Sequence, residues 1–159
     1  TVFSRMGGFY SWNVRGVEEV IKKALSKRDD IYFLFVQTHP FVNHPRVIHV
    51  DPFSDLHTKR KFINTSDAFL HARLEGESFG VACGEYSSCN KPVITFSKSP
   101  ERNHIVTLGN KGIYYDSAQQ LLDILTSFHY DPSQDWNAYK EFTPEKVIKK
   151  FKKVFLDKI

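Results

Sequence analysis

An unbroken apolar run at residues 31–37, IYFLFVQ, constrains the fold of this chain more than any other feature. The run is far shorter than the ~20 apolar residues that a membrane-spanning helix needs. Strands that are buried on both faces of a parallel sheet have this pattern. Parallel strands are joined by crossover connections, which are usually helices. The run therefore predicts a sheet that is covered by helices.

The rest of the chain alternates between strand-like and helical patterns. Strands are predicted at residues 2–5, 31–37, 46–51, 67–72, 91–97 and 112–116. Helices are predicted after Asn13, from Ser54 to Asn64, at 79–89, after Ser117 and at 143–159. This order predicts an α/β fold, a Rossmann-like, doubly wound and mostly parallel sheet of about six strands with helices on both faces. We expect the ligand outside the carboxyl ends of the strands.

The composition fits one soluble globular domain, with 159 residues, 41% of them hydrophobic and 25% charged. The chain starts directly at Thr1 with a strand-like run and shows no signal peptide, so we expect residues 1–159 to be one domain cut from a longer protein. Cys83 and Cys89 lie six residues apart in one predicted helix and point to different faces. We expect two reduced thiols in a cytoplasmic protein.

The formal net charge is +4, and its basic excess is concentrated in residues 145–158. Lysines at this density could face nucleic acid. However, apolar residues recur there at helical spacing, which favours a helix with one solvated, lysine-rich side. We therefore expect no nucleic-acid partner, and a peripheral contact with a membrane stays open.

Residues 74–85, LEGESFGVACGE, carry the strongest functional signal. Glu77 and Glu85 lie eight residues apart on either side of a turn at a predicted helix start. That start offers unpaired N–H groups and a partial positive charge, and Gly80 lets a phosphate approach the backbone. Eight helical residues span about 12 Å, so two carboxylates could hold both ends of a nucleotide-sugar. The alternative is that Glu77 only complements the helix dipole and that Glu85 is an exposed helix position.

Residues 67–95, DAFLHARLEGESFGVACGEYSSCNKPVIT, resemble the donor-binding domain of GT-B nucleotide-sugar glycosyltransferases of the group 1 family. That family has two glutamates separated by seven residues with Phe-Gly between them, here Glu77 and Glu85. An Asp-led hydrophobic strand precedes the pair and a Pro-Val-Ile strand follows it, here from Asp67 and from Pro92. The three elements have the order and spacing of the family.

The resemblance implies a role for each of several residues. Glu77 would contact hydroxyls of the transferred sugar as a catalytic residue, and Glu85 would bind the ribose. The backbone of Ser78, Phe79 and Gly80 would face the sugar and the phosphates.

Two cations complete the implied site. Arg5 and Arg15 would hold the diphosphate and stabilise it as it leaves, because a guanidinium matches phosphate oxygens. The alternative for each is an ordinary surface cation.

Histidines add two further candidates. His71 precedes the donor loop and is expected to line the donor pocket, the alternative being a packing or surface histidine. The base pocket is expected near His49 to Phe53, after the third strand. None of the seven histidines forms an HxH or HExxH pattern. We therefore predict no metal and no cofactor, with a nucleoside diphosphate sugar as the substrate.

The activity implied by the resemblance is hexosyl transfer, with retention of configuration, to a glycan, lipid or protein acceptor. An N-terminal acceptor domain of the same protein would supply the acceptor face, and the helix at 143–159 could dock it. The fragment alone is then expected to turn over little. Three alternatives stay open: a nucleotide-sugar epimerase of the same fold, a phosphorylase, whose cofactor lysine pattern is not visible, and a non-catalytic nucleotide-sugar-binding domain.

Overall fold

A computed structural model describes residues 1–7 and 16–156 of the chain. Within these residues six parallel strands form one sheet in the order β3-β2-β1-β4-β6-β8. The strands are β1 (Val2–Met6), β2 (Tyr32–Val36), β3 (Val47–Val50), β4 (Ala68–Leu70), β6 (Val93–Phe96) and β8 (Gly112–Tyr115). The chain winds outward from β1 in one direction and from β4 in the other. The predicted doubly wound α/β sheet is confirmed, and its switch point lies between β1 and β4.

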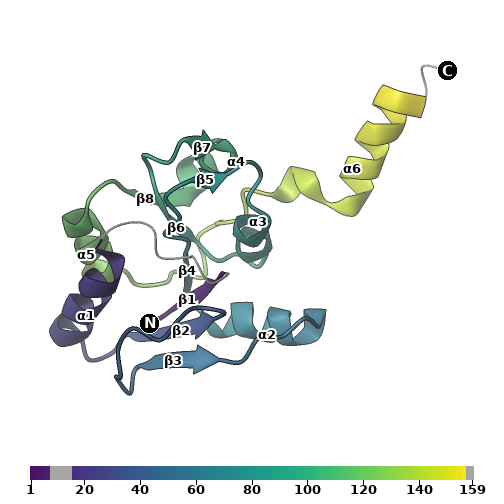
Figure 1. Cartoon of the computed structure of the whole chain (residues 1–159). Coiled ribbons are helices and arrows are strands. Elements are labelled where there is room, and N and C mark those ends of the chain that lie inside the picture. The colour runs from purple at the N-terminus through teal and green to yellow at the C-terminus, as the bar shows by residue number, and fades with distance from the viewer. Residues whose placement is uncertain (8–15, 157–159) are drawn as a thin grey trace.

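Helices cover both faces of the sheet (Figure 1). They are α1 (Val17–Lys27), α2 (Leu56–Thr65), α3 (Val81–Ser88), α4 (Asn103–Leu108), α5 (Ala118–Ser127) and α6 (Pro144–Phe151). Helices α1 and α5 pack together on one face, where Ile21 and Leu125 are fully buried with Phe3, Phe33 and Phe35 of the sheet. Their apolar residues recur at three- and four-residue spacing, which directs one stripe to the sheet.

The opposite face is covered by α2 and α3. The ring of Tyr86 in α3 stacks on Phe69 of β4 with centroids 4.2 Å apart. Its hydroxyl lies 2.7 Å from Ser4 Oγ of β1, which satisfies both buried polar groups. Helix α3 is therefore fixed against the two strands that flank the switch point.

The segment that follows α5 returns to α3 and braces it from outside. Ser87 Oγ donates to the carbonyl of Trp136 and accepts from the N–H of Ala138, at 2.8 Å each. Asn90 Oδ1 accepts from the N–H of Trp136 at 2.8 Å. The same segment continues through η2 (Lys140–Phe142) into α6.

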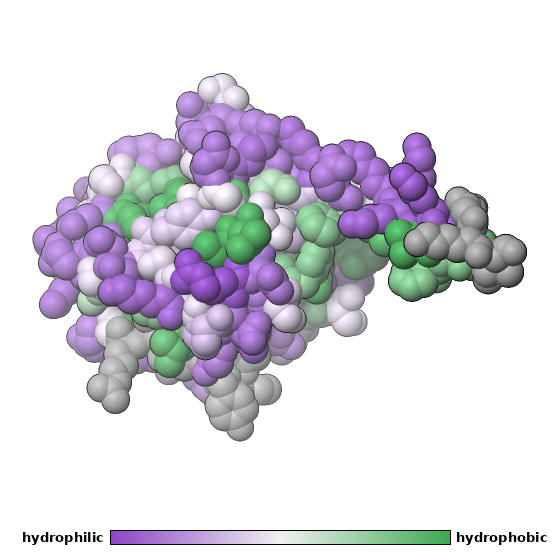
Figure 2. All heavy atoms as spheres, turned by 90° about the horizontal axis from the view of Figure 1, so that it is seen from above, coloured by the Kyte–Doolittle hydropathy of each residue, from purple (hydrophilic) through white to green (hydrophobic). Residues whose placement is uncertain are grey.

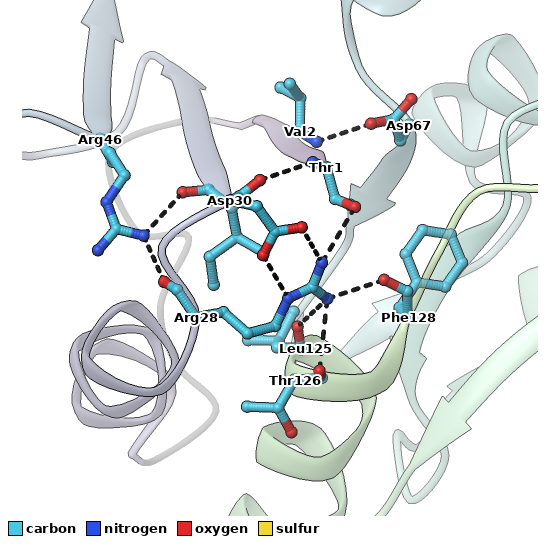
Figure 3. Close-up of polar contacts among 10 residues, drawn as sticks. Thr1, Val2, Arg28, Asp30, Arg46, Asp67, Leu125, Thr126 and Phe128 are labelled. Carbon is cyan, nitrogen blue, oxygen red and sulfur yellow. Dashed lines mark hydrogen bonds and ion pairs between the residues drawn. The ribbon is translucent and has the colours of Figure 1, made fainter.

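Polar side chains close the amino edge of the sheet (Figure 3). The guanidinium of Arg28 forms an ion pair with Asp30 at 2.6 Å and donates to the carbonyls of Leu125 and Phe128 at the end of α5. Asp67 accepts from the N–H of Val2 at 2.8 Å. The charged side chains at this edge therefore connect the strands to one another and to the end of α5.

Local differences from the sequence predictions concern helix starts and short elements. The α2 cap is Asp55, not Ser54, because Asp55 accepts from the N–H of Thr58 at 2.8 Å. Ser117 is confirmed as the cap of α5, whereas Asn13 lies outside the described residues. Helix α4 and the two-residue strands β5 (Gly76–Glu77) and β7 (Glu101–Arg102) were not predicted, because segments so short carry no periodicity.

Helix α6 projects away from the sheet (Figure 1), after a cap at Thr143 and a start at Pro144, within the range predicted for the last helix. It continues as a π-helical segment, η3 (Lys152–Leu156). The projecting segment carries hydrophilic and hydrophobic side chains on different sides (Figure 2). Its apolar side chains are all more than 40% exposed: Val147, Ile148, Phe151, Val154, Phe155 and Leu156. In the described ranges, no helix combines the length and apolar character that a bilayer crossing requires.

Candidate functional site

The backbone under Glu77 is fixed by a small parallel sheet in which β5 pairs with β7. Gly76 precedes Glu77 with φ +75°, and a Cβ there would lie 1.9 Å from the carbonyl oxygen of Glu101. Only glycine fits such a close backbone approach. The short strand therefore places Glu77 beyond the carboxyl ends of β4 and β6.

The Glu77 carboxylate is held by two donors. Its Oε1 accepts from Arg73 Nη1 at 2.7 Å and lies 3.2 Å from His71 Nε2. The hydrogen bond from His71, followed by that from Arg73, lowers the pKa of Glu77, so the carboxylate is ionised at neutral pH. Its side chain is 24% exposed, which leaves it accessible to a ligand.

His71 lies behind Glu77 and not on an open pocket wall. The residue is 3% exposed, and burial lowers the pKa of its ring below the usual value, although Glu77 opposes this effect. The neutral ring therefore donates an ordinary hydrogen bond to Glu77 and does not form an ion pair. His71 was expected to line the donor pocket. In the structure it lies behind Glu77 and supports the Glu77 carboxylate.

The turn of Ser78, Phe79 and Gly80 connects β5 to α3, and α3 begins at Val81 instead of the predicted Phe79. The reason is that Gly80 has φ +79°, a left-handed conformation outside the helix. Ser78 and Phe79 are exposed. The carbonyl of Phe79 accepts from the hydroxyl of Tyr139 at 2.9 Å, so the bracing segment also fixes this turn.

Glu85 lies on α3, about one turn beyond the helix start, and its Oε1 accepts from Lys59 Nζ of α2 at 2.9 Å. The two side chains are 29% and 30% exposed, so solvent reaches the pair. Both residues line a cavity of about 320 Å³ at the carboxyl edge of the sheet. The other lining residues are Met6, Gly7, Val36, Gln37, Phe53, Val81 and Ala82.

This cavity lies where a doubly wound sheet binds its ligand. Met6 ends β1 and Gly7 follows it, Val36 ends β2 and Gln37 follows it, and Val81 starts α3. The structure thus places Glu85 at a cavity beside the switch point, as expected for a ligand-binding carboxylate.

Arg5 is the second-last residue of β1 at the same edge, but the residue is only 3% exposed. Its Nη1 donates to the carbonyl of Leu70 at 3.2 Å and, more closely, to that of His71. Burial lowers the pKa of Arg5 to about 10, which leaves the guanidinium charged at neutral pH. Arg5 therefore supplies positive charge from beneath the site and, in this structure, bonds backbone carbonyls.

One predicted site residue, His49, is not joined to this group. His49 Nδ1 lies 3.1 Å from the carbonyl oxygen of Thr38, and the ring packs between Phe35 and Phe41. Phe35 belongs to the α1 and α5 face, so the structure places His49 away from the cavity, whose nearby aromatic residue is Phe53. Arg15 lies outside the described residues.

Three residues of this region were not among the sequence candidates, namely Lys59, Arg73 and Thr95. Thr95 had a signal, because it is the polar residue of a buried strand and needs a partner. Arg73 precedes Glu77 by four residues in a loop, where spacing carries no geometric meaning. Lys59 reaches Glu85 from 26 positions away, and only the tertiary fold shows this contact.

Over residues 1–7 and 16–156, no three His, Cys, Asp or Glu side chains lie close enough together to hold a metal ion. Burial raises the pKa of the Cys83 thiol, which therefore stays protonated.

Solved structures share this fold at low sequence identity. HepE of Anabaena, solved with UDP and glucose, is 15% identical with a TM-score of 0.64, and the match covers 92% of this chain and 42% of HepE. WaaG, a glycosyltransferase of lipopolysaccharide biosynthesis, is 14% identical with a TM-score of 0.64 over 98% of this chain and 47% of WaaG. A glycosyltransferase of Rickettsia africae is 22% identical with a TM-score of 0.56 over 94% of this chain and 43% of its own.

The chain thus spans less than half the length of these three structures. A comparison with curated protein sequences found no significant match. The family model described as glycosyl transferases group 1 matches residues 43–152, which include Glu77, Glu85 and the cavity wall from Phe53 to Ala82. Because this match covers more than half of the chain, the protein belongs to the glycosyl transferases group 1 family.

Proposed function

We propose that this chain is the donor-binding domain of a retaining glycosyltransferase that moves a hexosyl group from a nucleoside diphosphate sugar to an acceptor. The observation that carries the proposal is the placement of Glu77 and Glu85 on either side of the α3 start, at the carboxyl edge of the sheet. Glu85 lines the cavity, and Glu77 lies beyond the glycine turn. Family membership and the shared fold of sugar-transferring enzymes support it.

In this proposal the cavity at Glu85 takes the nucleoside. Its volume, about 320 Å³, is in the range of a small-molecule site. A carboxylate accepts hydrogen bonds from both vicinal hydroxyls of a ribose, and Phe53 offers an apolar ring for the base. Lys59 would then exchange its partner or stay beside the bound ribose.

The diphosphate would lie over the turn of Ser78, Phe79 and Gly80, where α3 presents its first N–H groups. As the glycosidic bond breaks, the pair of bonding electrons stays with the diphosphate oxygen, and negative charge grows there. The helix start, the buried charge of Arg5 and Arg15 would stabilise that charge. Since protein groups supply this stabilisation, we expect a chelator to leave donor affinity unchanged.

Glu77 would hold the sugar. Its ionised carboxylate accepts from Arg73 and His71 through Oε1, so a sugar hydroxyl can donate to Oε2. Such contacts orient the anomeric carbon relative to the leaving group and the acceptor.

The acceptor face would come from an N-terminal domain of the same protein, docked by α6. The apolar side chains of α6 are exposed, and a groove of about 820 Å³ lies along it between residues such as Phe142 and Phe155. Phe151→Glu with Phe155→Glu in a longer protein should lower transfer and leave donor affinity unchanged. Loss of both properties would contradict docking as the role of α6.

Binding of nucleotides to the chain itself tests the proposal. Thermal shift and calorimetry would use UDP, GDP, ADP, UDP-glucose, GDP-mannose and ADP-glucose, with UDP the first probe because HepE was solved with it. A bound ligand at 100-fold its Kd stabilises the folded state by about 2.7 kcal/mol. Binding of none of the six at millimolar concentration would overturn the proposal, and a labelled donor with the longer protein separates transfer from epimerisation.

A further inference from the structure

A chain of hydrogen bonds runs from Glu77 into the protein. His71 Nε2 lies 3.2 Å from Glu77 Oε1, and His71 Nδ1 lies 2.9 Å from Thr95 Oγ1. Thr95 Oγ1 in turn lies 3.1 Å from His104 Nε2. His71 follows β4, Thr95 lies in β6 and His104 lies in α4. None of the three residues is more than 3% exposed.

With both rings neutral, the donors and acceptors in this chain fit one arrangement, in which the buried Nδ1 of His104 has no hydrogen-bond partner among the described residues. A carboxylate only accepts, so His71 carries its hydrogen on Nε2. Burial keeps His71 neutral, so Nδ1 has a lone pair and accepts from the Thr95 hydroxyl. That hydroxyl has one hydrogen and therefore accepts from Nε2–H of His104, whose ring is also kept neutral because burial lowers its pKa to about 4.

Packing holds the chain in place. The His71 and His104 rings lie 4.9 Å apart between centroids, and the ring of Phe69 lies 5.7 Å from that of His71. A Cβ added to Gly80 would lie 2.9 Å from His104 Cβ, so α4 directly contacts the turn that follows Glu77. The segment that supplies His104 begins with β7, which pairs with β5. The same short segment therefore supports both the backbone and the side chain of Glu77.

We propose that Thr95 and His104 are positioning residues that act through His71 to hold Glu77 Oε1 and leave Oε2 for a hydroxyl of the bound sugar. The sugar contact rests on the proposed function, whereas the hydrogen-bond chain does not. Neither Thr95 nor His104 touches the ligand in this arrangement. They act by keeping the His71 ring from rotating. If the ring rotated freely, the Glu77 carboxylate would lose its fixed orientation.

The first test is spectroscopic and needs no ligand. Two-bond ¹H–¹⁵N spectra of the ¹⁵N-labelled chain at pH 7.5 should show His71 and His104 each with a protonated Nε2 and a bare Nδ1. Thr95→Val removes the hydroxyl at nearly constant shape, so the ¹⁵N shift of the bare His71 Nδ1 should move towards that of a nitrogen without a hydrogen bond, and Thr95→Ser should restore the wild-type signal. A His71 ring that is protonated on Nδ1 in the wild type, or unchanged in Thr95→Val, would overturn the proposal.

The second test separates positioning from a structural role. In calorimetry, Thr95→Val should weaken UDP-glucose binding about tenfold relative to UDP, the effect of one lost charge-assisted hydrogen bond. Thr95→Ser should bind both as the wild type does. If Thr95→Val weakens the binding of UDP and UDP-glucose equally, or weakens neither, Thr95 does not position the Glu77 carboxylate for the sugar. If the wild type binds no donor, the proposed function fails, and the tautomer spectra still decide the hydrogen-bond chain.

Discussion

The two acidic residues of this site are supported in opposite ways. Glu77 stands on a glycine-dependent strand pair and accepts from the buried His71 as well as from the exposed Arg73, whereas Glu85 accepts from Lys59, whose side chain is 30% exposed. A carboxylate with fixed neighbours is oriented before a ligand arrives, and one with a solvent-exposed partner can exchange it. The comparison indicates that Glu77, the proposed sugar contact, is preorganised and that Glu85, the proposed nucleoside contact, can change its partner.

Disturbing the strand pair under Glu77 should change the stability of the protein more than any other substitution considered. Gly76→Ala combines a positive φ with a contact of 1.9 Å to Glu101 oxygen, so we expect a loss of more than about 3 kcal/mol in unfolding free energy. Gly16→Ala is the matched control, because it shares the positive φ but its Cβ would lie 3.8 Å from Ala118. Urea unfolding of the two variants should differ by about 2 kcal/mol. Equal losses would show that the close approach of β5 and β7 is unimportant.

Acid should act selectively on the Glu77 side. The pKa of His104 falls from 6.5 to about 4 and that of His71 falls below its usual value, both chiefly by burial. The unfolded chain therefore binds more protons between these values, so stability is full above pH 6.5 and falls as the pH drops towards 4. The pKa of Glu77 is also lowered, so protonation of its carboxylate at lower pH reduces the stability further.

The size of this acid effect is up to about 3 kcal/mol for His104. Urea midpoints measured from pH 7.5 to 4.5 should decline, and the decline should be shallower in His104→Gln, whose amide can keep the donor to Thr95. A stability that is flat over this range would mean that the histidines are not buried neutral groups.

Sequence patterns predicted the sheet and selected both glutamates as candidates, because long apolar runs and a spaced motif are local information. They missed the support of each glutamate, because that support depends on tertiary contacts. The link from Glu77 through His71 and Thr95 to His104 needs the packing of α4, which no sequence spacing shows. Lys59 is separated from Glu85 by 26 positions. His49 was expected near the base, but the alternation along β3 directs it to the face opposite the cavity.

Breaking the support of Glu85 should have the smallest effect. Lys59→Met removes an ion pair that solvent reaches, so stability should change by less than about 1 kcal/mol. UDP affinity should rise about threefold, because ribose hydroxyls no longer displace an ammonium. Lys61→Met, which alters an exposed residue of the same helix, is the control and should change neither. A large loss of UDP affinity in Lys59→Met alone would assign Lys59 to the ligand itself.

The central claim is that Glu77 holds the sugar and Glu85 the nucleoside, and calorimetry of Glu77→Gln and Glu85→Gln with UDP and UDP-glucose tests it most directly. Glu77→Gln should weaken UDP-glucose about 10- to 100-fold and leave UDP within about twofold, whereas Glu85→Gln should weaken both about 10- to 100-fold. The claim is contradicted if Glu77→Gln weakens UDP as much as UDP-glucose, or if Glu85→Gln leaves UDP binding unchanged.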